Sequence, residues 1–218
     1  MPISPTDFVI VRHGETEGNL ARRLQGQQDT PLSANGVLQV QAAARRLADE
    51  PFDFAYCSDL GRAVQTADLL AKANPTLHFT QLAGLREWYI GEAEGTPLSE
   101  FKTRYPQEFQ AFLKENCDIR APGGESRGEF QARVTRTMND LAARHPGKRL
   151  LLVAHGGTLQ RIFRLVVGPT LPENRLALTD NASISRVRHY PDTGEWQLLV
   201  WNSQDHLQHL QLNPTLAY

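Results

Sequence analysis

Two histidine residues stand where a ligand of an α/β sheet would bind. Arg12-His13-Gly14 follows the apolar run 8–11, and His155-Gly156 follows the apolar run 150–154. Both runs are typical of buried strands, and ligands of open α/β sheets bind outside the carboxyl ends of the strands. Glycine after each histidine lets backbone N–H groups approach a ligand closely. The pattern therefore predicts a ligand site at one edge of the sheet.

Arginine residues nearby indicate which ligand that site would take. Arg12 adjoins His13, and Arg62 lies one turn into a helix expected after a second strand. Guanidinium groups bind phosphate oxygens bidentately, and the N-terminal end of a helix also favours anions. Taken alone, Arg62 would more often be a surface residue. Together, the two arginines and two histidines predict a phosphoryl site.

Strands that alternate with amphipathic helices must position these residues. We expect strands at 8–11, 54–57, 77–80, 149–154, 183–190 and 195–201, with a turn at 191–194 joining the last two. Helices should extend to about 48, 73, 141 and 167, and the first three are expected to begin at caps. The caps are Ser33, then Ser58 or Asp59, then Ser126 with Glu129 in a capping box. This alternation predicts an α/β fold with a largely parallel sheet.

The segment 88–122 differs from the rest of the chain, because it has helical patterns and no convincing strand. Its aromatic residues fall on one helical face, which favours a packed helical insertion over a ligand-stacking surface. Pro106 predicts a break in that pattern. We expect the insertion to cover the site in the manner of a lid. The aromatic face comprises Phe101, Tyr105, Phe109 and Phe112.

An ordered set of motifs extends from about residue 8 to 190. The motifs are 11–16 (Val-Arg-His-Gly-Glu-Thr) with Asn19, Gln25-Gly26, 29–33, 58–63, 85–87, 123–126, 153–157 and 181–184. In this order they resemble the signature of the histidine phosphatase superfamily, which includes cofactor-dependent phosphoglycerate mutases. The resemblance implies a three-layer α/β/α sandwich, phosphoglycerate mutase-like, with a mostly parallel central sheet flanked by helices. It also implies a single domain over residues 1–218, with the helical insertion at about 88–122.

The resemblance implies a role for each residue of the phosphoryl site. His13 would be the nucleophile that forms a phosphohistidine. Glu87 would donate a proton to the leaving oxygen and then take one from water. The non-bridging oxygens would be held by Arg12, Arg62, His155 and the Gly156 N–H, with Asn19 as an added donor. The other substrate-binding residues would be Gln25, Gly26, Trp88 and Tyr89.

Each assignment has a structural alternative. Glu87 could form a surface ion pair with Arg86, which is the better expectation without the family pattern. Asn19 could be a turn residue, and Gln25-Gly26 could merely shape its loop. Glu15 could support Arg12 instead of meeting substrate. The remaining histidines fit no constellation and are expected to be non-catalytic: His78, His145, His189, His206 and His209.

The closest likeness within the superfamily is to its small phosphatases. Mutases continue the acid–base glutamate as Glu-Arg-His-Tyr-Gly, whereas this chain reads Glu-Trp-Tyr-Ile-Gly at 87–91. We therefore expect a metal-independent phosphatase that hydrolyses phosphomonoesters of small metabolites, with no metal and no cofactor. Two alternatives stay open: a cofactor-dependent phosphoglycerate mutase, and a non-catalytic member that binds phosphate or serves as a scaffold.

Other enzyme signatures fail in their context. Residues 124–128 match G-x-S-x-G, but that nucleophile elbow needs a strand directly before its serine, and Ala121-Pro122-Gly123 precedes it here. His13-Gly14-Glu15 matches half of a zinc deaminase signature, but the P-C-x-x-C half is missing. The sequence also has no G-x-x-x-x-G-K-[ST] nucleotide-binding loop.

Composition limits the partners and the compartment. The chain has 23 Lys and Arg against 24 Asp and Glu, so it has no whole-surface attraction to nucleic acid or to an anionic membrane. Two cysteines are not a disulfide framework, and the start of the chain does not resemble a signal peptide. A cytoplasmic protein with a small phosphorylated metabolite as its partner is the expectation, without nucleic acid or membrane. A homodimer is left open.

Overall fold

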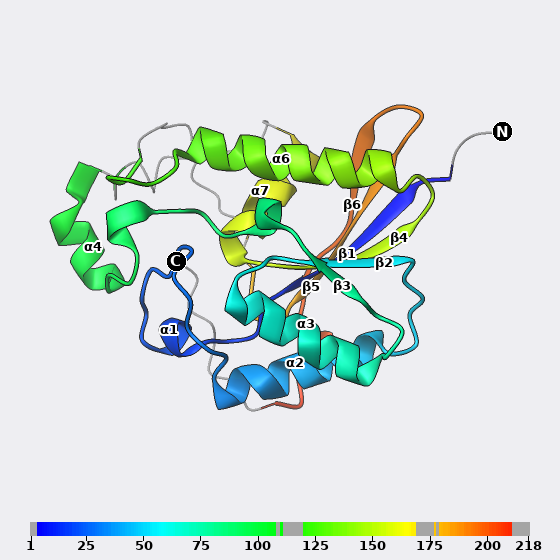
Figure 1. Ribbon diagram of the computed structural model, residues 1–218, viewed down its shortest axis with the longest axis horizontal. Helices are drawn as coiled ribbons and strands as arrows, with labels where there is room; N and C mark the ends of the chain where they lie inside the picture. Colours follow the sequence, from blue (N-terminus) through cyan, green and yellow to red (C-terminus); the bar gives the residue numbers. More distant parts are fainter. Residues whose placement is uncertain (1–3, 108–109, 111–119, 169–176, 178, 211–218) are drawn as a thin grey trace.

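A six-stranded sheet runs through the centre of the computed structural model, which describes residues 4–107, 110, 120–168, 177 and 179–210 (Figure 1). Four neighbouring strands are parallel, and β5 runs antiparallel to both of its neighbours. The order across the sheet is β3 (Phe79–Gln81), β2 (Phe54–Cys57), β4 (Arg149–Ala154), β1 (Thr6–Arg12), β5 (Ile184–Tyr190) and β6 (Glu195–Ser203). The predicted α/β fold with a mostly parallel sheet is confirmed.

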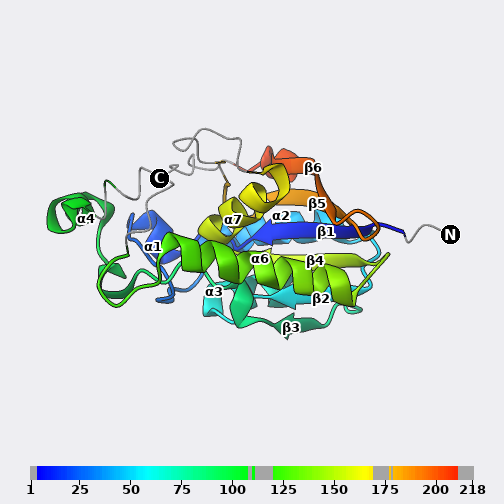
Figure 2. The same cartoon turned by 90° about the horizontal axis from the view of Figure 1, so that it is seen from above.

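Helices cover both faces of this sheet (Figures 1 and 2). One face packs against α2 (Ala34–Leu47) and α3 (Gly61–Ala73), and the other against α6 (Arg127–Arg144) and α7 (Gly156–Val167). Successive side chains of a strand point to opposite faces, so Val9 and Val11 join the first core cluster while Phe8 and Ile10 join the second. The central strands are apolar on both faces because each face packs against a layer of helices. The three-layer α/β/α arrangement matches the prediction.

Two of the predicted helix caps are confirmed. The Ser33 hydroxyl accepts a hydrogen bond from the backbone N–H of Gly36 at 2.9 Å, at the start of α2. Ser126 and Glu129 form a reciprocal capping box at the start of α6: the Glu129 N–H donates to Ser126 Oγ at 3.1 Å, and the Ser126 N–H donates to Glu129 Oε2 at 2.7 Å. These bonds satisfy N–H groups that the first helical turn leaves unpaired.

The predicted cap of α3, Ser58 or Asp59, is wrong. The helix starts later, at Gly61, and its capping residue Leu60 has no side chain that can accept a hydrogen bond. The Asp29 carboxylate accepts instead, from Gly61 N–H at 2.6 Å and from Arg62 N–H at 3.3 Å. The carboxylate reaches the helix from a distant loop, so local sequence around the helix does not reveal it.

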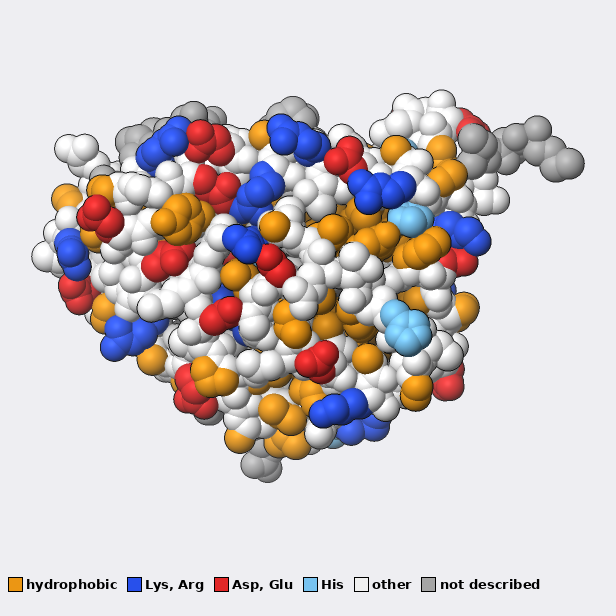
Figure 3. Space-filling model, in the orientation of Figure 1, with side chains coloured by type: hydrophobic (Ala, Val, Ile, Leu, Met, Phe, Trp, Pro, Cys, Tyr) orange, Lys and Arg blue, Asp and Glu red, His pale blue; other side chains and the backbone are white. Residues whose placement is uncertain are grey.

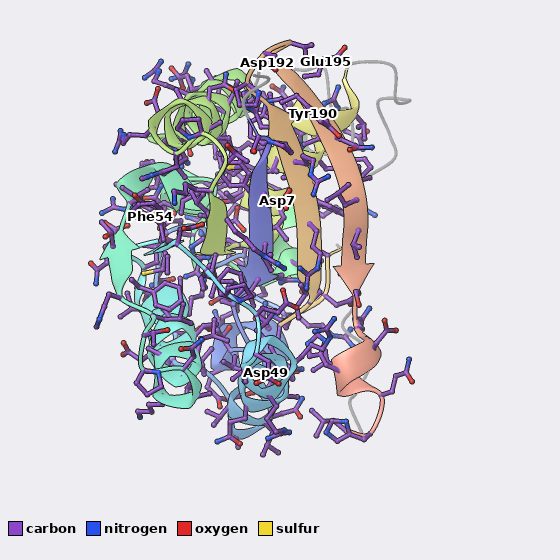
Figure 4. All side chains as sticks on the ribbon, turned by 90° about the vertical axis from the view of Figure 1, so that its right-hand side faces the viewer. Asp7, Asp49, Phe54, Tyr190, Asp192 and Glu195 are labelled. Carbon is purple, nitrogen blue, oxygen red and sulfur yellow. The ribbon has the colours of Figure 1, made fainter. Side chains whose placement is uncertain are left out.

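The final two strands form an antiparallel hairpin at the edge of the sheet, as predicted. Its turn lies at the end of the sheet where β1 begins, and Figure 4 looks onto that end, with Asp7, Asp192 and Glu195 labelled. The short elements are α1 (Glu17–Leu20), α4 (Leu98–Arg104) and three 3₁₀ turns, η1 (Ala83–Leu85), η2 (Gly91–Ala93) and η3 (Asp205–Leu207). The carboxyl ends of the parallel strands face the opposite end of the molecule, toward α1 and α4.

The segment predicted as an insertion has its own small core. Phe101 and Tyr105 are buried, with their ring centroids 5.6 Å apart, and they pack with Ala93 and Ala121. The helix α4 ends at Arg104, ahead of Pro106, as predicted. Phe109 and Phe112 lie outside the described residues, and a lid over the site stays a prediction. Within the described residues, every helix is too short or too polar to cross a bilayer.

Candidate active site

The two strand-end histidines meet at one edge of the sheet. Strands β1 and β4 are parallel neighbours with Arg12 opposite Ala154, so the residue after each strand lies at the same edge. The rings of His13 and His155 are 5.2 Å apart between centroids and are tilted by 57°. Both side chains are buried, at 3% and 0% exposure. The predicted pairing of these histidines is therefore what the sheet topology produces.

The hydrogen bond of His13 defines which ring nitrogen can act as a nucleophile. Its Nδ1 lies 2.7 Å from the carbonyl oxygen of Gly14. A carbonyl oxygen only accepts, so Nδ1 carries the proton and Nε2 carries the lone pair. Burial, followed by the charges of Arg62 and Arg12, lowers the pKa of His13 well below 6.5. The ring is thus held neutral with Nε2 available to attack.

His155 has the opposite tautomer, because Arg62 donates to it. The Nε–H of Arg62 donates to His155 Nδ1 at 3.2 Å, so Nδ1 carries the lone pair and Nε2 carries the proton. That buried Nε2 has no hydrogen-bond partner among the described residues. Burial is also the main cause that lowers the pKa of His155 well below 6.5, with Arg62 next. His155 therefore presents a neutral N–H donor beside the His13 ring.

Arg62 joins the histidine site to the loop 26–29. Its side chain is buried, and it donates to the carbonyl oxygens of Gly26 at 2.7 Å and Gln28 at 2.9 Å, and to Asp29 Oδ1 at 3.1 Å. With the bond to His155, four of the five guanidinium N–H groups are used by protein atoms. Burial lowers the pKa of Arg62, and Glu87 and Asp29 oppose that effect.

Arg12 lies against the first turn of α7. Its side chain is buried, and its Nη1 donates to the carbonyl oxygen of Thr179. A Cβ atom added to Gly156 would lie 3.4 Å from the Arg12 guanidinium carbon. Gly156 is the first residue of the 12-residue helix α7, so its N–H is one of the groups that a helix N-terminus presents to anions. Arg12 therefore lies beside the residue whose N–H opens α7.

The Glu87 carboxylate lies at the same helix terminus. Its Oε2 accepts from the Gly157 N–H at 2.9 Å, and its Oε1 accepts from the Trp88 N–H at 2.8 Å. The structural alternative, an ion pair with Arg86, is wrong, because Arg86 pairs with Asp59 through bonds of 2.7 and 2.6 Å. Glu87 is therefore directed at the histidine edge and away from the surface pair.

Three expected binding residues have structural partners. Asn19 Oδ1 accepts from the Thr16 N–H at 3.1 Å, in the capping box of α1. Gln25 Oε1 accepts from Thr16 Oγ1 at 3.1 Å and from Thr30 Oγ1 at 2.8 Å. Gly26 has a positive φ of 56°, which glycine adopts without strain. These contacts fit the alternative in which Asn19, Gln25 and Gly26 shape the loop.

Trp88 and Tyr89 are placed differently from one another. Trp88 stacks on Phe130 with ring centroids 6.2 Å apart, and its Nε1 donates to the Glu125 carbonyl oxygen at 2.9 Å. Tyr89 is 41% exposed. Trp88 is thus a packing residue, whereas Tyr89 presents its ring to solvent.

Glu15 supports a helix instead of Arg12. Its Oε1 accepts from the Ser33 hydroxyl at 2.7 Å and from Asn35 Nδ2 at 3.3 Å. Its N–H donates to Gln39 Oε1 at 2.9 Å. Glu15 therefore ties the loop after His13 to the first turns of α2, and none of these three hydrogen bonds is to Arg12, the partner in the structural alternative.

A brace that was not among the predicted site residues supports the backbone at His13. Asn181 Nδ2 donates to the His13 carbonyl oxygen at 3.1 Å, and the Ala182 N–H lies 3.1 Å from the carbonyl oxygen of Arg12. The side chain of Asp180 accepts from Asn202 Nδ2 and Gln204 Nε2, both at 2.7 Å. Asn181 belongs to one of the sequence motifs. Its partner is the carbonyl oxygen of His13, which any residue type would supply, so the sequence does not reveal this contact.

The molecular surface carries mixed charge on one face. On the face shown in Figure 3, Lys and Arg side chains are interspersed with Asp and Glu. The buried arginines 12 and 62 contrast with that surface. No group of three or more His, Cys, Asp or Glu side chains within the described ranges is arranged to hold a metal ion.

Comparison with known proteins gives concordant results. Residues 8–204 match the family model of the histidine phosphatase superfamily (branch 1). The chain is 34% identical over 204 residues to a metal-independent phosphoserine phosphatase of Arabidopsis thaliana, covering 93% of this chain and 83% of that protein. It is 40% identical over 179 residues to a probable phosphoglycerate mutase GpmB of Proteus mirabilis, covering 82% of each.

A solved structure shares the fold. A mycobacterial glucosyl-3-phosphoglycerate phosphatase in complex with VO3 superposes with a TM-score of 0.80 at 31% identity, covering 91% of this chain and 99% of that one. Sequence and fold therefore agree over nearly the whole chain. The family match, the relatives and the paired histidines together establish that this chain belongs to the histidine phosphatase superfamily, branch 1.

Proposed function

We propose that this protein is a metal-independent phosphatase that hydrolyses phosphomonoesters of small metabolites through a phosphohistidine on His13. One observation carries the proposal: the hydrogen bond from His13 Nδ1 to the Gly14 carbonyl oxygen, at 2.7 Å. It leaves a buried, neutral imidazole with its lone pair on Nε2. Neutral imidazole is the form that attacks phosphorus.

In the first step, His13 Nε2 attacks phosphorus and the bond to the leaving oxygen breaks. Arg12, Arg62 and the Nε2–H of His155 stabilise the three non-bridging oxygens, together with the Gly156 N–H. Phosphoryl transfer requires mostly positioning and charge stabilisation, and these donors lie on rigid elements. A protonated Glu87 carboxyl gives its proton to the leaving oxygen, so an alcohol departs.

In the second step, a water oxygen attacks phosphorus and the P–N bond breaks. Glu87, now a carboxylate, takes the proton that the water releases. Inorganic phosphate leaves, and Nε2 of His13 regains its lone pair. The hydrogen bonds from Gly157 and Trp88 to Glu87 support this role, because they hold the carboxylate at the terminus of α7.

Substrate contacts follow from what each residue already binds. The carbonyl oxygen of Asn19 is used in a capping box, so its amide nitrogen is the atom we assign to a phosphoryl oxygen. Tyr89, which is exposed, is assigned to the organic part of the substrate. Trp88, Gln25 and Gly26 contribute by shaping the loops beside the site.

A phosphoglycerate mutase is the second candidate, favoured by the 40% identity to a probable mutase. The similarity to phosphatases that are named for phosphoserine and glucosyl-3-phosphoglycerate favours hydrolysis. A phosphate-release screen across phosphomonoesters, run beside a 3-phosphoglycerate isomerisation assay, separates the two. We expect phosphate release without isomerisation, and isomerisation without release would overturn the proposal. A scaffold member would do neither.

Metal independence has its own test. We expect EDTA to leave phosphate release unchanged, because fixed guanidinium and N–H groups supply the positive field. Loss of activity in EDTA, restored by a divalent ion, would contradict this. A cytoplasmic location, a homodimer and a single domain over residues 1–218 stay predictions.

A further inference from the structure

One arginine of α6 holds the loop that carries Glu87. Arg133 Nη1 donates to the carbonyl oxygens of Gly84 at 3.2 Å and Arg86 at 2.9 Å, and its Nη2 donates to the carbonyl oxygen of Glu87 at 3.1 Å. The residues after η1 have no regular secondary structure up to Ile90. The carbonyl groups of Arg86 and Glu87 are therefore paired with side chains in place of a strand or helix. Besides Arg133, Thr158 Oγ1 donates to the Arg86 carbonyl oxygen at 2.9 Å and Gln27 Nε2 donates to that of Glu87 at 3.2 Å.

Glu125 completes the arrangement. Arg133 Nε donates to Glu125 Oε2 at 3.2 Å, and Nη2 donates to Glu125 Oε1. All five N–H groups of Arg133 are thus used. Glu125 Oε1 also accepts from the Tyr89 N–H at 3.0 Å, and the Glu125 N–H donates to the Tyr89 carbonyl oxygen at 2.9 Å. We refer to Arg133 and Glu125 as the loop clamp.

The loop clamp is largely shielded from water. The side chains of Arg133 and Glu125 are 24% and 16% exposed, so their charge-assisted bonds are screened less than those of a surface pair. The loop also approaches α6 closely: a Cβ atom added to Gly84 would lie 2.1 Å from Thr137 Oγ1. The clamp and this contact fix the distance between the loop and the helix.

The clamp reaches Glu87 only through its main chain. The carboxylate itself is held by the N–H groups of Gly157 and Trp88. A shift of the loop would move the carboxylate away from Gly157 while the phosphoryl donors, which lie on other elements, stay in place. The clamp therefore controls the position of the Glu87 carboxylate relative to the phosphoryl donors.

We propose that Arg133 and Glu125 are positioning residues for the proton transfer that Glu87 performs. This inference rests on the proposed function. General acid catalysis contributes roughly 10²- to 10⁴-fold, and it is needed most when the leaving alkoxide is a strong base. Loss of the clamp should therefore slow substrates with poor leaving groups and spare those with good ones.

The experiment compares two aryl substrates in each preparation of the full-length protein. The ratio of kcat/KM for p-nitrophenyl phosphate to kcat/KM for phenyl phosphate is measured for wild type, Arg133→Met, Arg133→Lys and Glu125→Gln. This ratio does not depend on the fraction of folded enzyme. Arg136→Met is the matched control, because Arg136 is exposed on the same helix.

We expect Arg133→Met to raise this ratio about tenfold. Arg133→Lys keeps the charge but lacks the planar fork, so it should raise the ratio by a smaller factor. Glu125→Gln should act in the same direction, and it carries the test if Arg133→Met does not fold. An effect of the lost charge on the phosphoryl donors would lower both substrates equally and leave the ratio unchanged. An unchanged ratio in all three variants would overturn the inference.

Glu87→Gln, measured in parallel, separates this inference from the proposed function. If Glu87→Gln raises the ratio and the clamp variants do not, the clamp has no positioning role and the acid assignment stands. If Glu87→Gln leaves the ratio unchanged, Glu87 is not the general acid and the inference falls with it. If both raise the ratio, the clamp acts through Glu87.

Discussion

Arg62 donates its Nε–H to Nδ1 of His155 at 3.2 Å, and this bond decides what His155 can do. It fixes the proton on Nε2, so the imidazole is a neutral donor next to His13. The same guanidinium binds the carbonyl oxygens of Gly26 and Gln28. One side chain thus sets a tautomer and anchors a loop, and its replacement should affect both activity and stability.

Arg62→Lys should lower kcat/KM by about 10²-fold, because lysine keeps the charge but cannot reproduce the fork of donors. It should also lower the urea midpoint, since buried carbonyl groups lose their partner. Steady-state kinetics and urea unfolding check both effects. Arg45→Lys, on the exposed side of α2, is the control. If Arg62→Lys has the kcat/KM of wild type, Arg62 does not contribute to catalysis.

The pH dependence of activity should reflect the buried state of His13. Burial lowers the pKa of His13 well below its ordinary value of 6.5, and Arg62 and Arg12 add to that effect. The nucleophile therefore stays neutral as the pH falls through 6.5. We predict an acid limb of kcat/KM that lies clearly below pH 6.5 for p-nitrophenyl phosphate. An acid limb at pH 6.5 would show that burial and the two arginines do not lower the pKa of His13.

The same shift has a consequence for stability. Below pH 6.5 the unfolded chain protonates this histidine and the folded chain does not, so the free energy of unfolding falls with falling pH. The slope approaches about 1.4 kcal/mol per pH unit for each such histidine. Urea unfolding of His13→Gln between pH 7 and 5 should show a smaller slope than wild type. His78→Gln, at an exposed position, is the control, and equal slopes in wild type and His13→Gln would contradict the account.

Asp29 should contribute to stability through a helix that lies far from it in sequence. It accepts from the N–H groups of Gly61 and Arg62 at the start of α3. Asp29→Ala should lower the free energy of unfolding by at least about 1 kcal/mol, the usual cost of a lost N-cap, because the buried Arg62 guanidinium also loses its bond to Asp29 Oδ1. Urea unfolding measures this, with Asp49→Ala as a control at the exposed end of α2 (Figure 4). No loss relative to Asp49→Ala would show that the cap is dispensable.

Gly157→Ala should separate activity from stability. An added Cβ would lie 2.2 Å from Glu87 Oε1, so the carboxylate must move, and a flexible side chain can do so cheaply. We predict a loss of about tenfold or more in kcat/KM for phenyl phosphate with a thermal unfolding midpoint close to that of wild type. Full activity in this variant would mean that the carboxylate does not act from the position seen here.

The histidine edge was predictable because its information is local. His13 and His155 each follow an apolar strand directly, and parallel strands bring their carboxyl ends together. The ordered motifs then identified the family. The capping box at Ser126 was predictable for the same reason, since both partners lie within one turn.

The errors and omissions share a different cause. The Asp29 cap reaches α3 from a loop that precedes α2, so that α2 and β2 separate the two partners in sequence. Arg133 acts through main-chain carbonyl groups. Every residue type has a main-chain carbonyl group, so a sequence motif cannot indicate that such a group is the partner. Support of Arg12 was one alternative for Glu15, but its carboxylate accepts from Ser33, a residue of another element.

The most direct test of the central claim is to locate the phosphoryl group on the enzyme. Wild type is incubated briefly with p-nitrophenyl phosphate, quenched under alkaline conditions and digested, and the peptides are analysed by mass spectrometry. We predict a phosphoryl group on the peptide that contains His13, and neither phosphoryl group nor turnover in His13→Ala. Turnover that survives in His13→Ala, or a phosphoryl group on another residue, would contradict the account.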